Sequence, residues 1–73
     1  NKQQVKEAFK TFYNIDATDE EANISYATPG DFAVIAKQLS YLNEKPTAAK
    51  IKEMLLIEIK NKKDDFKENN IKI

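Results

Sequence analysis

The side chains of this 73-residue chain that could do chemistry are carboxylates, lysine amines and hydroxyls, because the sequence contains no His, Cys or Trp. Without His or Cys there is no Ser-His or Cys-His nucleophile pair, no thiolate or imidazole zinc site and no disulfide. Every basic residue is Lys, which excludes an arginine finger and a bidentate guanidinium contact to phosphate. The single Gly excludes a Gly-rich phosphate loop. The chain is therefore not expected to be catalytic on its own.

The carboxylates are unevenly distributed along a chain whose net charge is zero. Residues 16–31 hold five acids and no Lys, whereas the segments before and after this stretch are net positive. Such a cluster is typical of an exposed helix start, where acids favour the positive end of the dipole, and a docking patch is the alternative. Zero net charge argues against nucleic-acid binding, and no segment combines Lys with base-reading side chains as a helix-turn-helix would.

The length supports one small domain, in which 41% of residues are apolar and 33% are charged. No apolar run approaches the roughly 18 residues of a membrane span, and no signal peptide is visible. The lack of Cys fits a reducing compartment, so a cytoplasmic location is expected. The chain begins at Asn1 rather than Met, and we expect it to be a fragment of a longer protein.

Four segments repeat apolar residues at the helical period and predict helices over about 2–13, 19–26, 29–42 and 48–67. The first segment carries the apolar stripe Val5, Ala8, Phe9 and Phe12. The second begins at Thr18, which has the spacing of a capping box with Glu21. It is short, and we expect Ala22, Ile24 and Tyr26 to turn inward.

The third segment has the strongest start signal, because Thr28 is a good N-cap, Pro29 suits the first helical position and Asp31 follows three residues after the cap. Its stripe consists of Phe32, Ile35, Ala36, Leu39 and Leu42. Thr47 caps the fourth segment, whose stripe is Ile51, Leu55 and Ile59, with Phe66 continuing the pattern. Together these segments predict an all-α four-helix bundle, with room for a short extended tail over 71–73.

The fourth segment also contains a continuous apolar run, 54–57, that one helical stripe cannot cover. Leu56 and Ile57 point away from the face that carries Ile51 and Leu55. This helix is therefore either buried on most sides, or it offers Leu56 and Ile57 to another domain or subunit. The pair is a candidate interface.

One stretch carries a recognisable motif, Tyr26-Ala27-Thr28-Pro29-Gly30-Asp31-Phe32-Ala33-Val34-Ile35-Ala36. It follows a first helix that contains three aromatic residues, Phe9, Phe12 and Tyr13. Together they resemble the C-terminal helical lid of AAA+ ATPases, and in particular a bacterial subgroup whose lids carry Thr-Pro-Gly-Asp-Phe-Ala after a Phe-rich helix. That subgroup is related to hexameric remodelling machines of the cell-division-cycle and proteasomal-regulatory type. The likeness covers nearly the whole chain.

The resemblance implies a nucleotide near the start of the third segment. In that family this turn lies against the adenine and ribose of a nucleotide bound by the neighbouring α/β core. In this sequence the nucleotide-proximal residues are then Pro29, Gly30 and Asp31. Gly30 allows a ligand to approach the backbone closely, whereas Asp31 would repel a phosphate. Many related lids place an Arg at this helix start, and this chain departs from that pattern.

The resemblance also implies that the catalytic parts lie outside these residues. ATP or ADP with Mg would be held mainly by the missing α/β core, and this fragment alone would bind no cofactor. The implied partners are that core and the neighbouring subunit of a homo-hexamer, which Leu56 and Ile57 would contact. The parent would be a cytoplasmic ATPase whose lid closes over the nucleotide and couples hydrolysis to subunit motion.

Two other interpretations stand beside the lid. The Thr28–Asp31 turn is also explained as a well-capped helix start, whose cap contributes about 1 kcal/mol to stability. Alternatively, the chain is a free-standing helical interaction module that binds a partner through Leu56 and Ile57. The reading frame upstream of Asn1 separates these hypotheses, because a lid requires a phosphate-binding loop roughly 150 residues earlier.

Overall fold

The computed structural model describes residues 1–42 and 45–71, with side chains described up to residue 62. It contains the helices α1 (Lys2–Tyr13), α2 (Pro29–Ser40) and α3 (Ala48–Ile71), and no strand forms within the described ranges. The protein is all-α, as the apolar period predicted.

The helix expected over 19–26 does not form, so the four-helix count is wrong for the described residues. A single turn replaces it, closed by the Ala22 N–H, which donates to the Thr18 carbonyl at 2.9 Å. Beyond this turn the backbone of Tyr26 is left-handed, with φ 69°, a conformation that an α-helix cannot contain. Asn23 and Ser25 are poor helix formers, so the local sequence gives the turn no means to propagate.

The ends of α1 and α2 follow from their caps. Asn14 ends α1 in the left-handed conformation, with φ 57°, a role for which Asn is among the favoured residues. Helix α2 ends at Ser40 rather than at residue 42, and Tyr41 occupies the C-cap position. Leu42 therefore lies outside the helix and is 49% exposed, although the sequence pattern placed it on the buried stripe.

Helix α3 is longer than expected, because it continues to Ile71 instead of ending near residue 67. Ile71 is therefore helical rather than part of an extended tail. Residues 72–73 and the side chain of Phe66, which also entered the predictions, lie outside the described residues.

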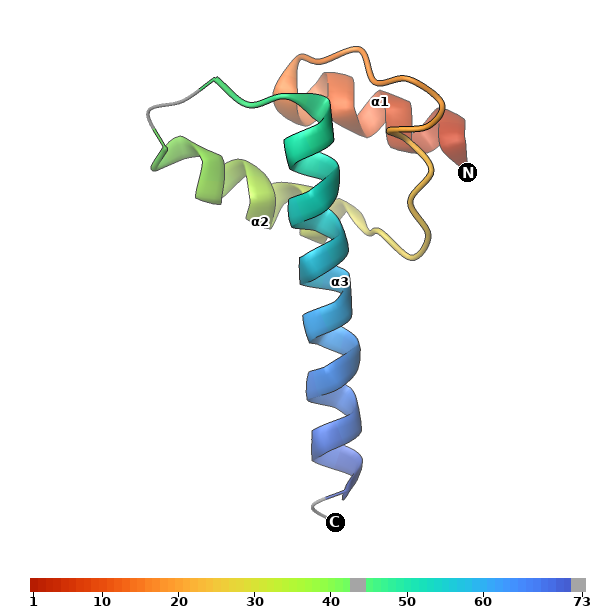
Figure 1. Ribbon diagram of the computed structural model, residues 1–73, viewed down its shortest axis with the longest axis vertical. Helices are drawn as coiled ribbons and strands as arrows, with labels where there is room; N and C mark the ends of the chain where they lie inside the picture. Colours follow the sequence, from red (N-terminus) through yellow and green to blue (C-terminus); the bar gives the residue numbers. More distant parts are fainter. Residues whose placement is uncertain (43–44, 72–73) are drawn as a thin grey trace.

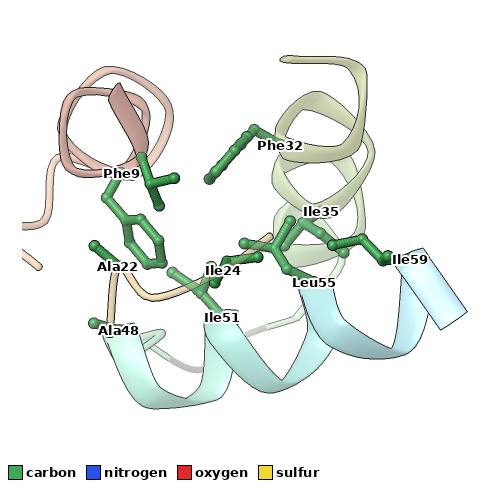
Figure 2. Close-up of a cluster of buried hydrophobic side chains, with 10 residues drawn as sticks. Phe9, Ala22, Ile24, Phe32, Ile35, Ala48, Ile51, Leu55 and Ile59 are labelled. Carbon is green, nitrogen blue, oxygen red and sulfur yellow. The ribbon is translucent and has the colours of Figure 1, made fainter. Parts of the chain in front are cut away.

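The core forms where α1 and α2 pack against one face of α3 (Figure 2). Side chains from all three helices and from the α1–α2 connection contribute to it: Val5, Phe9, Ala22, Ile24, Phe32, Ile35, Ala48, Ile51, Leu55 and Ile59. Burying each large side chain stabilises the fold by about 1.5–3 kcal/mol. Phe12, which was expected in this core, is instead 37% exposed at its edge.

Helix α3 is the longest helix, and its C-terminal part projects well beyond the region where it packs with α1 and α2 (Figure 1). Its 24 residues span about 36 Å at 1.5 Å per residue, most of the 43 Å long axis. Within its side chains described here, the last core residue is Ile59. No helix in the described part of the chain combines the length and the apolar character that crossing a membrane requires.

The connection between α1 and α2 is attached to α1 and to α3. Lys6 forms an ion pair with Asp19, and the pKa of that carboxyl is lowered, chiefly by the hydrogen bond from Lys6. Lys52 of α3 donates to the Glu20 carbonyl at 2.6 Å. Much of the acidic stretch thus faces lysines of the same chain.

Candidate functional site

The turn that opens α2 is built as a capping box. The Thr28 Oγ1 accepts the Asp31 N–H at 3.3 Å, and the Asp31 Oδ2 accepts the Thr28 N–H at 2.9 Å. Pro29 occupies the first helical position, where its missing N–H costs no hydrogen bond. The motif at 28–31 therefore forms the helix start that the sequence predicted.

Asp31 is the buried member of this turn, with only 4% of its surface exposed. Its Oδ1 accepts a hydrogen bond from the Lys62 Nζ of α3 at 3.0 Å, while Oδ2 is held by the Thr28 backbone. Burial alone would raise the pKa of this carboxyl. The hydrogen bonds from Thr28 and Lys62 outweigh burial, so the Asp31 pKa lies below its ordinary value.

Pro29 and Gly30 lie on the opposite, exposed side of the turn. Gly30 does not adopt a positive φ, and a Cβ built on it would meet only the Thr28 Oγ1, at 3.6 Å, which is an ordinary contact. The fold therefore does not require glycine at this position.

The structure thus separates the three predicted nucleotide-proximal residues. Pro29 and Gly30 face solvent, whereas Asp31 lies beneath them and binds Lys62. Sequence reasoning missed Lys62. The signal available in the sequence is its position, because Lys62 lies seven residues after Leu55 and so falls on the same face of the helix as the apolar stripe.

An aromatic cluster supports the same turn from the side of α1. The Phe12 and Phe32 rings stack with centroids 5.9 Å apart and planes at 20°, and the Phe9 ring meets Phe32 edge-on. The Tyr13 hydroxyl donates to the Phe32 carbonyl at 2.9 Å, and burial raises the pKa of this phenol. The first turn of α2 is therefore fixed by α1 as well as by α3.

An open cleft of about 780 Å³ lies between α1, the connecting segment 22–28 and the start of α2. Its apolar lining includes Val5, Ala8, Phe12 and Phe32. Pro29 also lines it, so the exposed face of the α2 turn lies at the edge of a concave surface. No sequence pattern indicates this cleft, because the cleft depends on the irregular path of residues 23–28.

Leu56 and Ile57 lie on the outward side of α3, where 46% and 53% of their surfaces are exposed. This agrees with the expectation that the 54–57 run exceeds what one buried stripe can cover. Leu55, between the core positions Ile51 and Ile59, is fully buried. Whether Leu56 and Ile57 contact a partner stays a prediction.

Acidic residues within the described part of the chain form no group that could hold a metal ion. Comparison of the chain with family models, with curated proteins and with solved structures finds no match. The case for a function therefore comes from the motif and from the geometry of the α2 turn.

Proposed function

We propose that this chain is the C-terminal helical lid of an AAA+ ATPase, which closes over an adenine nucleotide bound by an α/β core. The observation that carries the proposal is the exposed Pro29–Gly30 turn, which lies at the edge of a ligand-sized cleft. Here a backbone without a side chain is available to a ligand, although the fold itself has room for a Cβ.

The contacts that hold the first turn of α2 in place suit a lid that moves as a rigid body. Three interactions hold its first residues: the Thr28 cap, the Lys62–Asp31 ion pair from α3 and the Tyr13 hydrogen bond from α1. A displacement of the turn by a nucleotide would therefore move α1 and α3 with it. Rigid-body motion of this kind is a standard way to transmit ligand occupancy.

In this proposal the core supplies the chemistry. ATP or ADP with Mg is bound mainly by the core, and the parent protein is a cytoplasmic ATPase that works as a homo-hexamer. Leu56 and Ile57, exposed on the outward side of α3, contact the neighbouring subunit. The isolated 73-residue chain hydrolyses no ATP.

The first test is the reading frame upstream of Asn1. A Gly-x-x-x-x-Gly-Lys-Thr/Ser loop about 150 residues earlier is expected under the lid proposal. A start codon directly before Asn1, or measurable ATP turnover by the 73-residue chain, would overturn it.

The second test uses Gly30→Ala in the protein that joins the lid to its core. The added methyl group fits the fold but projects from the exposed turn, so ATP affinity should fall while the lid stays folded. Ser40→Ala, at the exposed far end of α2, is the matched control and should leave ATP affinity unchanged. Equal affinities for both variants would place the nucleotide elsewhere.

A second candidate function rests on the exposure of Leu56 and Ile57. A free-standing interaction module would use this apolar pair to bind a partner helix or domain. A start codon directly before Asn1 would favour this function over the lid.

A further inference from the structure

Helix α3 leaves the packed body directly after Ile59, the last buried residue among its described side chains. The side chains at positions 60–62 are exposed. The helix nevertheless continues to Ile71 and projects away from α1 and α2 (Figure 1). Isolated helices shorter than about 12–15 residues are marginally stable in water, so the helix over 60–71 depends on how firmly its first turn is held.

Lys62 is the described side chain that attaches this first turn to α2. Its Nζ lies 3.0 Å from the Asp31 Oδ1, while the Asp31 Oδ2 accepts the Thr28 N–H at 2.9 Å. The capping box therefore fixes the carboxylate on the side of α2. The Lys62 side chain is 52% exposed, so α3 is the partner that moves away when the contact opens.

This ion pair differs from the two others within the described residues. In those pairs, which join α1 to the connection, the side chains of Asp19 and Asp16 are 73% and 90% exposed. Ion pairs of that kind contribute little to stability. The Asp31 side chain is only 5% exposed, and a buried carboxylate that loses its cation is left poorly solvated, which is costly. This cost makes the two ends of the Lys62 contact depend on each other.

We propose that the Asp31–Lys62 contact is a latch between the start of α2 and the projecting part of α3. With the latch closed, α3 is held as a helix past Lys62. With the latch open, α3 unwinds back to Ile59, where the core holds it. Displacement of Asp31 opens the latch, and a pull on Lys62 loosens the Thr28 box, because coupling between two sites is reciprocal. The latch involves no nucleotide, so it is independent of the lid proposal.

The test measures amide hydrogen exchange in the 73-residue chain by NMR, because exchange reports local opening of a helix. Lys62→Met removes the cation and retains the aliphatic stem. The amides of residues 61–66 should then exchange about three- to thirtyfold faster, a range between the effects of an exposed ion pair and of a hydrogen bond to a charged group. The amides of Ile35 and Ile51, which lie in the core, should keep their wild-type rates.

Lys52→Met is the matched control, because Lys52 also belongs to α3 but donates to the Glu20 carbonyl. It should leave exchange at 61–66 unchanged. Lys62→Arg keeps the cation and should exchange as the wild type does. If Lys62→Met leaves residues 61–66 unchanged, or speeds the core amides by the same factor, the latch is wrong.

A second pair of variants tests whether a change at the turn reaches the projecting part of α3. Thr28→Ala removes the hydroxyl that accepts the Asp31 N–H and does not alter α3 itself. Exchange at 61–66 should rise by about two- to fivefold, because part of the lost cap energy is transmitted. Thr47→Ala is the control, because the Thr47 Oγ1 accepts the Lys50 N–H at the other end of α3. Equal rates at 61–66 for the two variants would show that the contact is a passive tether and overturn the latch.

Discussion

Two turns in this protein share one local motif and have different fates. At the first, the Thr18 N–H donates to the Glu21 Oε1 at 2.9 Å, and the Glu21 N–H donates to the Thr18 Oγ1 at 3.1 Å. At the second, Thr28 and Asp31 exchange the same pair of hydrogen bonds. Only the second turn continues into a helix. A reciprocal capping box therefore does not by itself decide whether a helix forms.

The residues after each box account for the difference. Phe32 and Ile35 follow the Thr28 box, and both are buried against α1 and α3. After the Thr18 box come Ala22, Asn23, Ile24 and Ser25, of which Ala22 and Ile24 are buried. These two are only two residues apart, so they would not share one face of a helix, whereas Phe32 and Ile35 are three apart and do. Because nucleating a helix is costly, a short segment needs tertiary packing of an apolar face to extend beyond one turn.

The two boxes also differ in what their third residue contacts. Glu21 is partly exposed and serves the local turn, whereas the buried Asp31 also binds Lys62 of α3. The Thr28 box is therefore a tertiary contact as well as a cap. This difference predicts which substitutions will lower the free energy of unfolding of the whole protein and which will affect only the local turn.

The largest effect is expected from removing the packing that follows the Thr28 box. Phe32→Ala should lower the free energy of unfolding by about 3–5 kcal/mol, because it deletes a 3% exposed ring that contacts Phe9 and Phe12. Urea unfolding followed by circular dichroism measures this loss. Val34→Ala, at a 40% exposed position of the same helix, is the control and should change stability much less. Similar losses for the two variants would contradict the packing argument.

A smaller loss is expected from the box itself. Asp31→Ala removes a buried acceptor of two hydrogen bonds, so it should cost about 2 kcal/mol. Glu21→Ala, the matched change in the other box, should cost about 0.5 kcal/mol.

A double-mutant cycle of Asp31→Ala with Lys62→Met isolates the contact to α3. Coupling should be clear for this pair and absent between Glu21→Ala and Lys62→Met. Equal coupling in the two cycles would show that the Thr28 box is as local as the Thr18 box.

The Asp31 contribution should also depend on pH. Its pKa in the folded state is lowered, so as the pH falls the unfolded chain takes up the proton first. The stabilisation is then complete well above pH 4 and is lost as the pH falls through the folded-state pKa. Urea unfolding from pH 7 to pH 2.5 should show a smaller loss for Asp31→Asn than for the wild type. Parallel curves would refute the coupling to Asp31.

Sequence reasoning found the features that depend on local periodicity. The three helices, the Thr28 cap and the outward position of Leu56 and Ile57 all follow from apolar spacing and capping chemistry. Sequence reasoning failed where tertiary contacts determine whether an element forms. The Thr18 box looked like a helix start because the cap is visible in the sequence and the missing packing is not. The cleft depends on the left-handed Tyr26, which no apolar pattern reveals.

The smallest effect on stability is expected at Gly30, where the two turns differ in backbone freedom rather than in side-chain contacts. Gly30 occupies the second helical position after Thr28, where the Thr18 turn has Glu20. Gly30→Ala should raise the free energy of unfolding by about 0.4–1 kcal/mol, because the alanine restricts the unfolded chain and its methyl group meets only an ordinary contact. Ala33→Gly, one turn further along α2, should lower it by a similar amount. A destabilised Gly30→Ala would mean that the fold needs this glycine. A stabilised one would show that the fold does not need this glycine, as the proposed approach of a ligand to the turn requires.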